Sequence, residues 1–533
     1  MGLTGNGFVF YVSAFLILVC NVTFFKEILK VYPLSTSTAF ALATLPLMLG
    51  LTSLLLLGVL SFGRTTKPVL AVILVLSSLA AYFMDSYGVV ISSEMLQNAT
   101  QTNVSEASDL LNLKLIAYLG VLGVLPAVAI FRVPFRWRGW RTELLARLKL
   151  LALATVLLGV IIVSFGSFYA SFFREHKVLR FYANPTYYVY SAIKLFGRQL
   201  RTETDSTIMP IGEDARVKAG DPHRELIFLV IGETARADRF SLNGYARDTN
   251  PLLRQENVIS FTNFWSCGTS TAVSVPCMFS ALGKNAYNEK QAQHQENLLD
   301  VVRRSGVYVV WLDNNSDSKG VAVRTPYKNY RSSEQNPICD TECRDEGMLA
   351  HIQKTIDAHP SGDILIVMHQ MGNHGPAYYK RYPKSFERFT PVCESNDLSR
   401  CKQEEIDNAY DNAILYTDYF LSKTIAILKQ NDDKFESALF YISDHGESLG
   451  ESGLFLHGLP YAIAPNSQTH VPAIMWFGKR FNEVDVTALA KKRGLRFSHD
   501  NLFHTVLGAL EIQSDVYRPE LDILRSVYKA EKH

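Results

Sequence analysis

A short loop in the middle of the chain carries the residues best suited to a covalent reaction. Hydroxyl side chains at Thr269, Ser270 and Thr271 lie between a glycine and a proline, and Cys267 and Cys277 are close enough to close the loop. A side-chain hydroxyl is a poor nucleophile until a base or a metal ion lowers its pKa. The loop therefore predicts a nucleophile only if an activating group lies elsewhere. On its own it is more typical of a disulfide-closed surface loop whose Ser and Thr cap a helix.

The chain after about Arg224 predicts strands whose ends could supply that activating group. Short β-rich apolar runs separated by helical stretches indicate a mostly parallel sheet covered by helices, with strands at Leu226–Ile231, Val307–Leu312, Ile364–Met368, Leu439–Ile442 and Ala473–Phe477. Ligands bind beyond the carboxyl ends of such strands. Acidic and imidazole side chains follow them: Glu233, His374, Asp444, His445 and, in a later turn, His457. A lone histidine is more often structural, but this combination predicts a metal site suited to zinc.

Several motifs, taken together, resemble those of a known family. They are Gly232-Glu233-Thr234, Cys267-Gly268-Thr269-Ser270-Thr271-Ala272, Asp313-Asn314-Asn315, His369-Gln370-Met371-Gly372-Asn373-His374-Gly375-Pro376 and Ser443-Asp444-His445-Gly446-Glu447. With the apolar N-terminal segments, they resemble the bacterial phosphoethanolamine transferases that modify lipid A, which include the mobilised colistin-resistance enzymes. The resemblance covers essentially the whole chain. It implies a C-terminal α/β domain of the alkaline-phosphatase and sulfatase type with a mostly parallel central sheet.

The resemblance also implies the zinc ligands and the nucleophile. Four residues match the family's principal ligand positions: Glu233, Thr271, Asp444 and His445. Thr271 also matches the nucleophile that becomes phosphorylated, and zinc at its oxygen would lower the hydroxyl pKa. In the implied reaction Thr271 attacks the phosphorus of phosphatidylethanolamine, diacylglycerol leaves, and a phosphate of lipid A then takes up the phosphoethanolamine group. The added ethanolamine cation weakens the attraction of cationic peptides, so polymyxin and colistin resistance is expected.

Five further residues match positions around the ligands. His374 and His457 match residues that bind the substrate phosphate or a second zinc ion, and Asn315, Lys319 and Glu447 resemble further residues of the substrate pocket. The expected cofactor is therefore one zinc ion, or two. Phosphatidylethanolamine and lipid A are the expected partners, and we expect a monomer.

Related functions remain open from the sequence. The same metal chemistry could act on core sugars of lipopolysaccharide or transfer phosphoglycerol, because the acceptor is selected by the groove and not by the motifs. A sulfatase is disfavoured, since that family needs a Cys or Ser followed by x-Pro-x-Arg, and neither Thr271 nor Cys277 has that context. A non-catalytic envelope protein with a structural metal is the alternative from another class. The net charge of +2 gives no argument for nucleic acid as a partner.

The first third of the chain predicts a membrane domain. Five segments are long and apolar enough to span a bilayer: Phe8–Phe25, Thr38–Phe62, Pro68–Met84, Leu115–Phe131 and Leu148–Phe172. Basic residues after the second and fourth segments indicate a cytoplasmic N-terminus, so an odd number of spans in the inner membrane places the remainder in the periplasm. We expect a transmembrane domain over residues 1–172, an interfacial bridge and linker over 173–223, broken near Pro185, and a catalytic domain over 224–533. Residues 88–109 are too polar to span and predict an interfacial segment or an ordinary loop.

Six of the seven cysteines form three close pairs: Cys267 with Cys277, Cys339 with Cys343, and Cys393 with Cys401. Such pairs could ligate a metal. However, the chain has no CxxC, and an even number of cysteines at short spacings beside a membrane anchor suits an oxidising compartment. We predict three disulfides.

Overall fold

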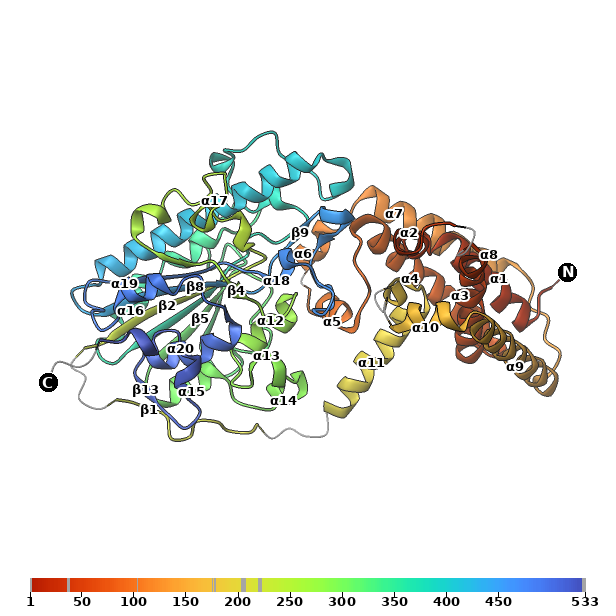
Figure 1. The fold of residues 1–533 in the computed structure, drawn as a ribbon, viewed down its shortest axis with the longest axis horizontal. Coiled ribbons are helices and arrows are strands. Elements are labelled where there is room, and N and C mark those ends of the chain that lie inside the picture. Colours follow the sequence, from red (N-terminus) through yellow and green to blue (C-terminus); the bar gives the residue numbers. More distant parts are fainter. Residues whose placement is uncertain are drawn as a thin grey trace. The chain divides into compact units, whose positions relative to one another are not determined.

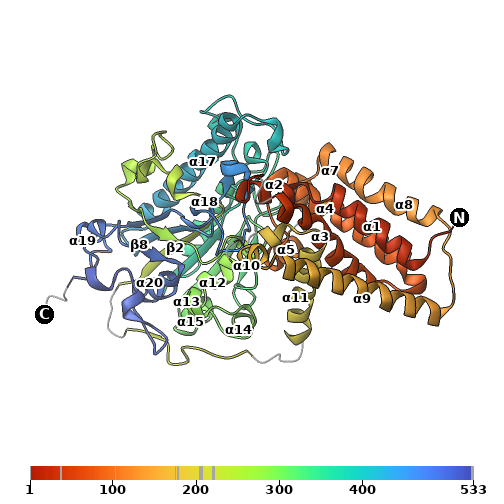
Figure 2. The same ribbon diagram turned by 45° about the vertical axis from the view of Figure 1, so that its right-hand side comes forward.

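The chain folds into two compact units in the computed structural model, which describes residues 2–35, 39–102, 104–174, 176, 179–202, 208–218 and 223–529. The first unit comprises Met1–Leu96 and Leu111–Gly197, and the second comprises Gln97–Leu110 and Arg198–His533. The first is helical, whereas the second contains a central sheet with helices on both faces (Figures 1 and 2). A helical N-terminal part followed by an α/β part is the predicted fold class.

Four helical segments of the described residues are long and apolar enough to cross a membrane. They are Ala39–Leu60 (α3), Gly63–Tyr87 (a 3-10 turn and α4, Thr66–Tyr87), Leu113–Arg132 (α7, Leu113–Tyr118, a π-helical stretch and α8, Leu125–Arg132) and Trp140–Ser164 (α9). A fifth candidate is the pair Gly5–Val19 (α1) and Val22–Val31 (α2), bent by 54°. By length and composition the first unit therefore has four such helices, or five spans if the bent pair counts as one.

The bend between α1 and α2 is stabilised by two asparagine side chains. Asn184 Nδ2 donates hydrogen bonds to Cys20 O at 3.1 Å and to Ser77 O at 2.9 Å. Asn21 Nδ2 donates to Asn184 O at 2.8 Å, and the Asn184 N–H donates back to Asn21 Oδ1 at 3.0 Å. Unpaired backbone groups are costly in an apolar environment, so these bonds allow the helix to break. The predicted span Phe8–Phe25 is therefore interrupted after its middle.

The last apolar helix differs in both ends from its prediction. α9 begins at Trp140, before the predicted start at Leu148, and ends at Ser164, after which α10 covers Gly166–Arg174. The early turns of α9 carry Glu143, which is buried and accepts a hydrogen bond from Arg138 Nε at 3.1 Å. Hydropathy alone assigns charged turns to a connection, whereas pairing allows a charged side chain to lie inside the bundle.

The polar connection after α4 is helical. Ser93–Gln101 forms α5 and Val104–Asp109 forms α6, and Gln97–Leu110 counts with the second unit. An ordinary loop at residues 88–109 was therefore the wrong alternative. In the predicted bridge, α11 (Thr186–Thr202) begins directly after Pro185, at the predicted break. Residues 203–207 and 219–222 of the predicted linker lie outside the described residues.

The second unit is built on a seven-stranded mixed sheet. In spatial order its strands are β3 (Ile259–Phe261), β11 (Ala473–Phe477), β8 (Glu436–Ser443), β2 (Glu225–Gly232), β7 (Ile364–His369), β5 (Tyr308–Asp313) and β6 (Tyr327–Asn329). Neighbours from β8 to β6 are parallel, whereas β11 runs antiparallel to both β8 and β3. All five predicted strands are present. β3 and β6 were not predicted, because so few residues carry no clear pattern.

Both faces of the sheet are buried. Alternate residues of β2 point to opposite faces: Leu226, Phe228 and Val230 pack with α16 (Ile352–Asp357) and α17 (Gln403–Gln430), and Ile227, Leu229 and Ile231 pack with α15 (Leu298–Arg304) and α20 (Leu502–Ala509). Figure 1 shows α17 on one side of the strands and α15 and α20 on the other. This covering explains why the central strands read as continuous apolar runs, and it fixes their carboxyl ends at one edge.

The three predicted disulfides are present: Cys267–Cys277, Cys339–Cys343 and Cys393–Cys401. Cys20, in the first unit, is a free, buried cysteine. All three disulfides lie in the second unit, each closing a short loop.

A buried histidine in the core of the second unit should make the stability of the fold sensitive to acid. His499 accepts the Cys267 N–H at Nδ1 and donates from Nε2 to Ser443 O, both at 3.0 Å, and burial lowers its pKa from 6.5 to about 4. Between these values the unfolded chain binds a proton that the folded chain does not, so stability is full above pH 6.5 and falls toward pH 4. The expected loss is about 3 kcal/mol. Thermal unfolding of the full chain in detergent, followed against pH, should show a smaller acid loss for His499→Gln than for the wild type.

The control for that experiment is His351→Gln, because this histidine is exposed. It should keep the wild-type acid dependence. An unchanged dependence in His499→Gln would contradict the assignment.

Candidate metal centre and nucleophile

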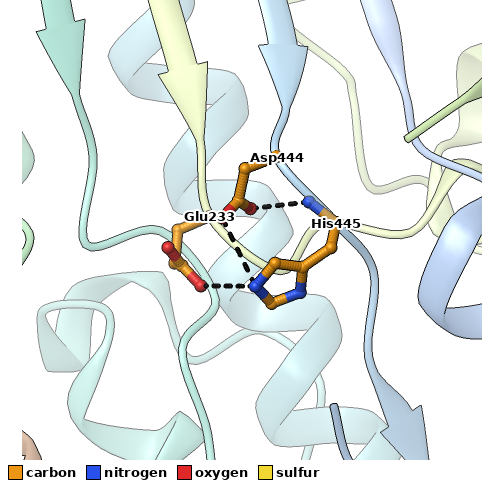
Figure 3. A group of neighbouring side chains, drawn as sticks. All are labelled: Glu233, Asp444 and His445. Atoms are coloured by element: carbon orange, nitrogen blue, oxygen red, sulfur yellow. Dashed lines mark hydrogen bonds and ion pairs between the residues drawn. The ribbon is translucent and has the colours of Figure 1, made fainter. Parts of the chain in front are cut away.

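Three buried side chains meet where two central strands end. Glu233 follows β2, and Asp444 and His445 follow β8, its parallel neighbour. One ligand-type atom from each lies within 4.8 Å of the others, and all three residues are fully buried (Figure 3). Neighbouring parallel strands bring their carboxyl ends to the same edge, so residues distant in sequence come together here.

The imidazole of His445 is held in one tautomer. Its Nδ1 lies 2.9 Å from Gly446 O, and because a carbonyl oxygen only accepts, Nδ1 carries the proton and Nε2 presents a lone pair. Nε2 lies 3.4 Å from Glu233 Oε1 and 3.3 Å from Asp444 Oδ2. Three electron-rich groups therefore face one another, and a cation among them would convert mutual repulsion into attraction.

The carboxylate of Asp444 is fixed by its other oxygen. Asp444 Oδ1 accepts hydrogen bonds from the backbone N–H of Thr234 at 3.2 Å and of His445 at 2.7 Å, and Oδ2 is turned toward the His445 ring. Burial raises the pKa of Asp444 to about 6, and it lowers the pKa of His445 well below its usual value. A divalent cation would offset the cost of burying the carboxylates. The donor set of two carboxylates, an imidazole and a hydroxyl fits zinc.

The hydroxyl in this set belongs to Thr271. Helix α12 (Thr271–Met278) begins at this residue, and Thr271 Oγ1 donates to Glu233 Oε2 at 3.0 Å and lies 3.3 Å from His445 Nε2. Thr271 is buried. The amide groups of a first helical turn favour negative charge nearby, so an alkoxide or a phosphoryl group at this oxygen is stabilised by the helix as well.

The loop before Thr271 is held tightly against its helix. The Cys267–Cys277 disulfide links the two, and the Gly268 N–H donates to Ser274 Oγ at 3.0 Å. A Cβ atom at Gly268 would lie 2.8 Å from Val273 Cγ1, so only glycine fits this close approach. The loop is therefore not the mere surface loop that its composition favoured, because Thr271 is buried against Glu233.

Two more histidines lie beside the His445 ring. The ring centroid of His457 is 4.4 Å from that of His445 and 5.5 Å from that of His374. His457 Nδ1 lies 3.1 Å from Glu447 Oε1. Burial and the neighbouring His457 lower the pKa of His374 well below its usual value. Three of the five further residues predicted from the sequence therefore lie together next to the metal-ligand cluster: His374, His457 and Glu447.

The remaining two predicted residues lie on the loop after β5. Asn315 Nδ2 donates to Glu233 Oε2 and to Gln370 O, both at 2.7 Å, so Asn315 orients a candidate ligand. Lys319 Nζ donates to Ser316 O at 2.8 Å and to Gln101 O at 3.2 Å. Its positive charge also contributes to the lowered pKa of His374. Lys319 therefore adds positive charge near the site.

Asp345 was not selected from the sequence, although this residue shapes the site. Asp345 is buried and accepts hydrogen bonds from the backbone N–H of Met371 at 2.8 Å and of Gly372 at 3.1 Å, in the turn that leads to His374. It also accepts from Asn314 Nδ2 at 2.8 Å. An aspartate just after a disulfide loop is ordinary in a sequence, so no local signal identifies it.

Four other histidines of the second unit have local partners. His369 Nδ1 contacts Asp313 Oδ2 at 3.1 Å, while His470, His499 and His504 each hydrogen-bond to backbone groups. Their contacts give no reason to assign them to the cluster.

Two family models match the chain. The model described as phosphoethanolamine transferase EptA/EptB matches residues 49–200, and the sulfatase model matches residues 225–512. Phosphatidylethanolamine transferase Mcr-1 of Escherichia coli is 41% identical over 525 residues, which cover 96% of this chain and 96% of that relative. Phosphoethanolamine transferase EptA of Salmonella typhimurium is 39% identical over 528 residues, covering 96% of this chain and 95% of that relative.

A solved structure is similar over almost the full length. It is the integral membrane protein lipooligosaccharide phosphoethanolamine transferase A (EptA) from Neisseria meningitidis, with a TM-score of 0.94 and 36% identity, covering 98% of this chain and 99% of that protein. Together with the sulfatase match, this similarity describes an N-terminal membrane domain followed by a sulfatase-like catalytic domain. The chain belongs to the phosphoethanolamine transferase family.

Proposed function

We propose that this chain transfers phosphoethanolamine from phosphatidylethanolamine to a phosphate of lipid A through a phosphorylated Thr271. The observation that carries the proposal is the distance of Thr271 Oγ1 from two candidate ligands, 3.0 Å to Glu233 Oε2 and 3.3 Å to His445 Nε2. The names of the relatives support the transferred group, and that of Mcr-1 supports the donor. The name of the Neisseria protein supports a lipooligosaccharide acceptor.

Glu233, Asp444, His445 and Thr271 would hold a zinc ion in this proposal. Bound zinc lowers the pKa of a coordinated hydroxyl and withdraws charge from phosphoryl oxygens. The protein orients two of these ligands before a metal binds. Asn315 Nδ2 donates to the Glu233 carboxylate, and Gly446 O accepts from the His445 ring. Such supporting hydrogen bonds orient ligands and tune their basicity.

The first half of the reaction makes one bond and breaks one. After its proton has passed to solvent, Thr271 Oγ1 bonds to the phosphorus of phosphatidylethanolamine, and the bond to the diacylglycerol oxygen breaks. That oxygen needs a proton as it leaves. His457 fits this role, because the Glu447 carboxylate 3.1 Å from its Nδ1 stabilises the protonated ring. In the second half a lipid A phosphate oxygen attacks the phosphothreonine, and Thr271 Oγ1 leaves.

His374 would act on the phosphoryl group without moving a proton. Its ring stays neutral because burial lowers its pKa, so it offers a hydrogen bond to a phosphoryl oxygen. Lys319 adds long-range positive charge. These roles follow the resemblance and agree with the grouping of the three histidines.

The inner membrane suits both substrates. Donor and acceptor are lipids, so a catalytic domain tethered by apolar helices meets them at high effective concentration. The positions of the basic residues favour a periplasmic location for that domain, as does the name of a similar structure, the C-terminal periplasmic domain of phosphoethanolamine transferase EptC from Campylobacter jejuni, at 44% identity and a TM-score of 0.55. Lipid A with more positive charge should protect the cell from polymyxin and colistin.

The proposed reaction predicts the effect of changing the nucleophile. Thr271→Ala removes the oxygen that forms the covalent bond, so transfer should fall roughly a thousandfold or more, whereas Thr271→Ser keeps a hydroxyl and should retain part of it. The measurement is a mass spectrum of lipid A from a Gram-negative host that expresses each variant at equal membrane abundance.

Three outcomes of that spectrum are informative. Phosphoethanolamine on lipid A only with an intact hydroxyl supports the proposal. The group on a core sugar would favour the second candidate acceptor, suggested by the 28% identical Kdo(2)-lipid A phosphoethanolamine 7''-transferase of Escherichia coli. Equal modification by Thr271→Ala would contradict the covalent step.

The hydrogen bond that Asn315 donates to Glu233 gives a prediction for zinc affinity. Asn315→Ala removes the donor 2.7 Å from Glu233 Oε2, so zinc affinity should fall about 10- to 100-fold. Titration of the metal-free protein with zinc in competition with a chelator measures this. Asn329→Ala is a matched control, because this asparagine lies on β6 and its side chain bonds to Arg331. An unchanged zinc affinity in Asn315→Ala would show that Asn315 does not support the metal site and would leave only its expected role in the substrate pocket.

A further inference from the structure

A buried arginine lies directly behind the loop that carries His374. The Arg381 side chain is 1% exposed. Its Nε donates to His374 O at 2.6 Å, its Nη2 donates to Asp109 Oδ2 at 2.6 Å, and its Nη1 contacts Glu342 Oε2. A guanidinium is always charged and only donates, so its position is decided by the acceptors around it.

Both carboxylates that neutralise Arg381 are supplied by segments fixed elsewhere in the second unit. Asp109 is buried at the end of α6 and also accepts from Lys380 Nζ at 2.5 Å. Glu342 lies inside the loop closed by the Cys339–Cys343 disulfide. The arginine therefore joins the α6 segment, the small disulfide loop and the His374 backbone at one point.

The His374 loop is held from two ends by these neighbours. At its start, Asp345 accepts the backbone N–H of Met371 and of Gly372. At its end, Arg381 holds the carbonyl of His374 itself. The His374 ring has a buried Nδ1 with no hydrogen-bond partner among the described residues. The backbone of this loop, which Asp345 and Arg381 hold, therefore contributes to the position of the ring.

We propose that Arg381 is a positioning residue for His374, and that Asp109, on the segment between the apolar helices α4 and α7, is its required counter-ion. Asp109 keeps the guanidinium in the orientation in which Nε meets His374 O. Without the Asp109 charge, Arg381 is drawn toward Glu342, and the His374 carbonyl loses a fixed donor. The polar segment after α4 thereby contributes to catalysis without touching substrate.

This inference rests on the proposed function, since its readout is phosphoethanolamine transfer. A double-mutant cycle in the full-length protein tests the positioning role. Asp109→Asn and Arg381→Gln are made alone and together with His374→Ala, and transfer kinetics and zinc content are measured. Each single variant should lower kcat about 10- to 100-fold, with KM and zinc content nearly unchanged, because a small misplacement of a group at the phosphoryl centre acts on the transition state. In the His374→Ala background neither change should lower kcat further.

Controls separate this inference from the proposed function and from a folding defect. Arg388→Gln alters an arginine that is 56% exposed and should keep wild-type kinetics. If Arg381→Gln does not fold, Asp109→Asn decides, because it leaves Arg381 paired with Glu342. A wild-type protein without transfer activity would refute the proposed function. An active wild type in which Asp109→Asn has no effect, or lowers kcat equally with and without His374, would overturn the positioning role alone.

Discussion

The structure of the second unit depends on one electrostatic constraint: two carboxylates and an imidazole lone pair face one another in a buried site. Glu233, Asp444 and His445 are fully buried, and the proton of His445 is committed to Gly446 O. Burying charge of one sign is costly unless an opposite charge lies close by. The rigid sheet meets part of this cost, because backbone N–H groups and Asn315 Nδ2 hold the carboxylate oxygens. A cation bound between these side chains would supply the missing opposite charge.

That constraint explains how the neighbouring elements are built. The nucleophile must reach the same point, so α12 begins at Thr271, and Gly268 permits the close contact of its preceding loop. The histidine group needs a second support, which comes from the turn after β7. There Asp345 and Arg381 fix backbone groups, whereas His457 relies on Glu447. The site is thus assembled from four strand ends, and hydrogen bonds to backbone groups maintain most of its geometry.

Sequence patterns predicted the parts of this structure that depend on local signals. The five main strands were recognisable because β2, β5, β7, β8 and β11 are buried on both faces and read as apolar runs. The ligand-type residues follow strand ends and were recognisable for the same reason. The antiparallel direction of β11 depends on tertiary pairing and has no local signal. The early start of α9 was missed because charged residues such as Glu143, which pairs with Arg138, are typical of a connection in a sequence. The short helices α5 and α6 were missed because their polar sequences carry no clear apolar period.

The connectivity of the disulfides has a consequence for how the chain becomes oxidised. Six cysteines can pair in fifteen ways. In this chain each cysteine of the second unit bonds to the next one along the sequence, with separations of 10, 4 and 8 residues. If the second unit enters an oxidising space from its N-terminal end, the two members of each pair emerge in immediate succession. Oxidation in order of emergence would therefore form the native bonds without reshuffling.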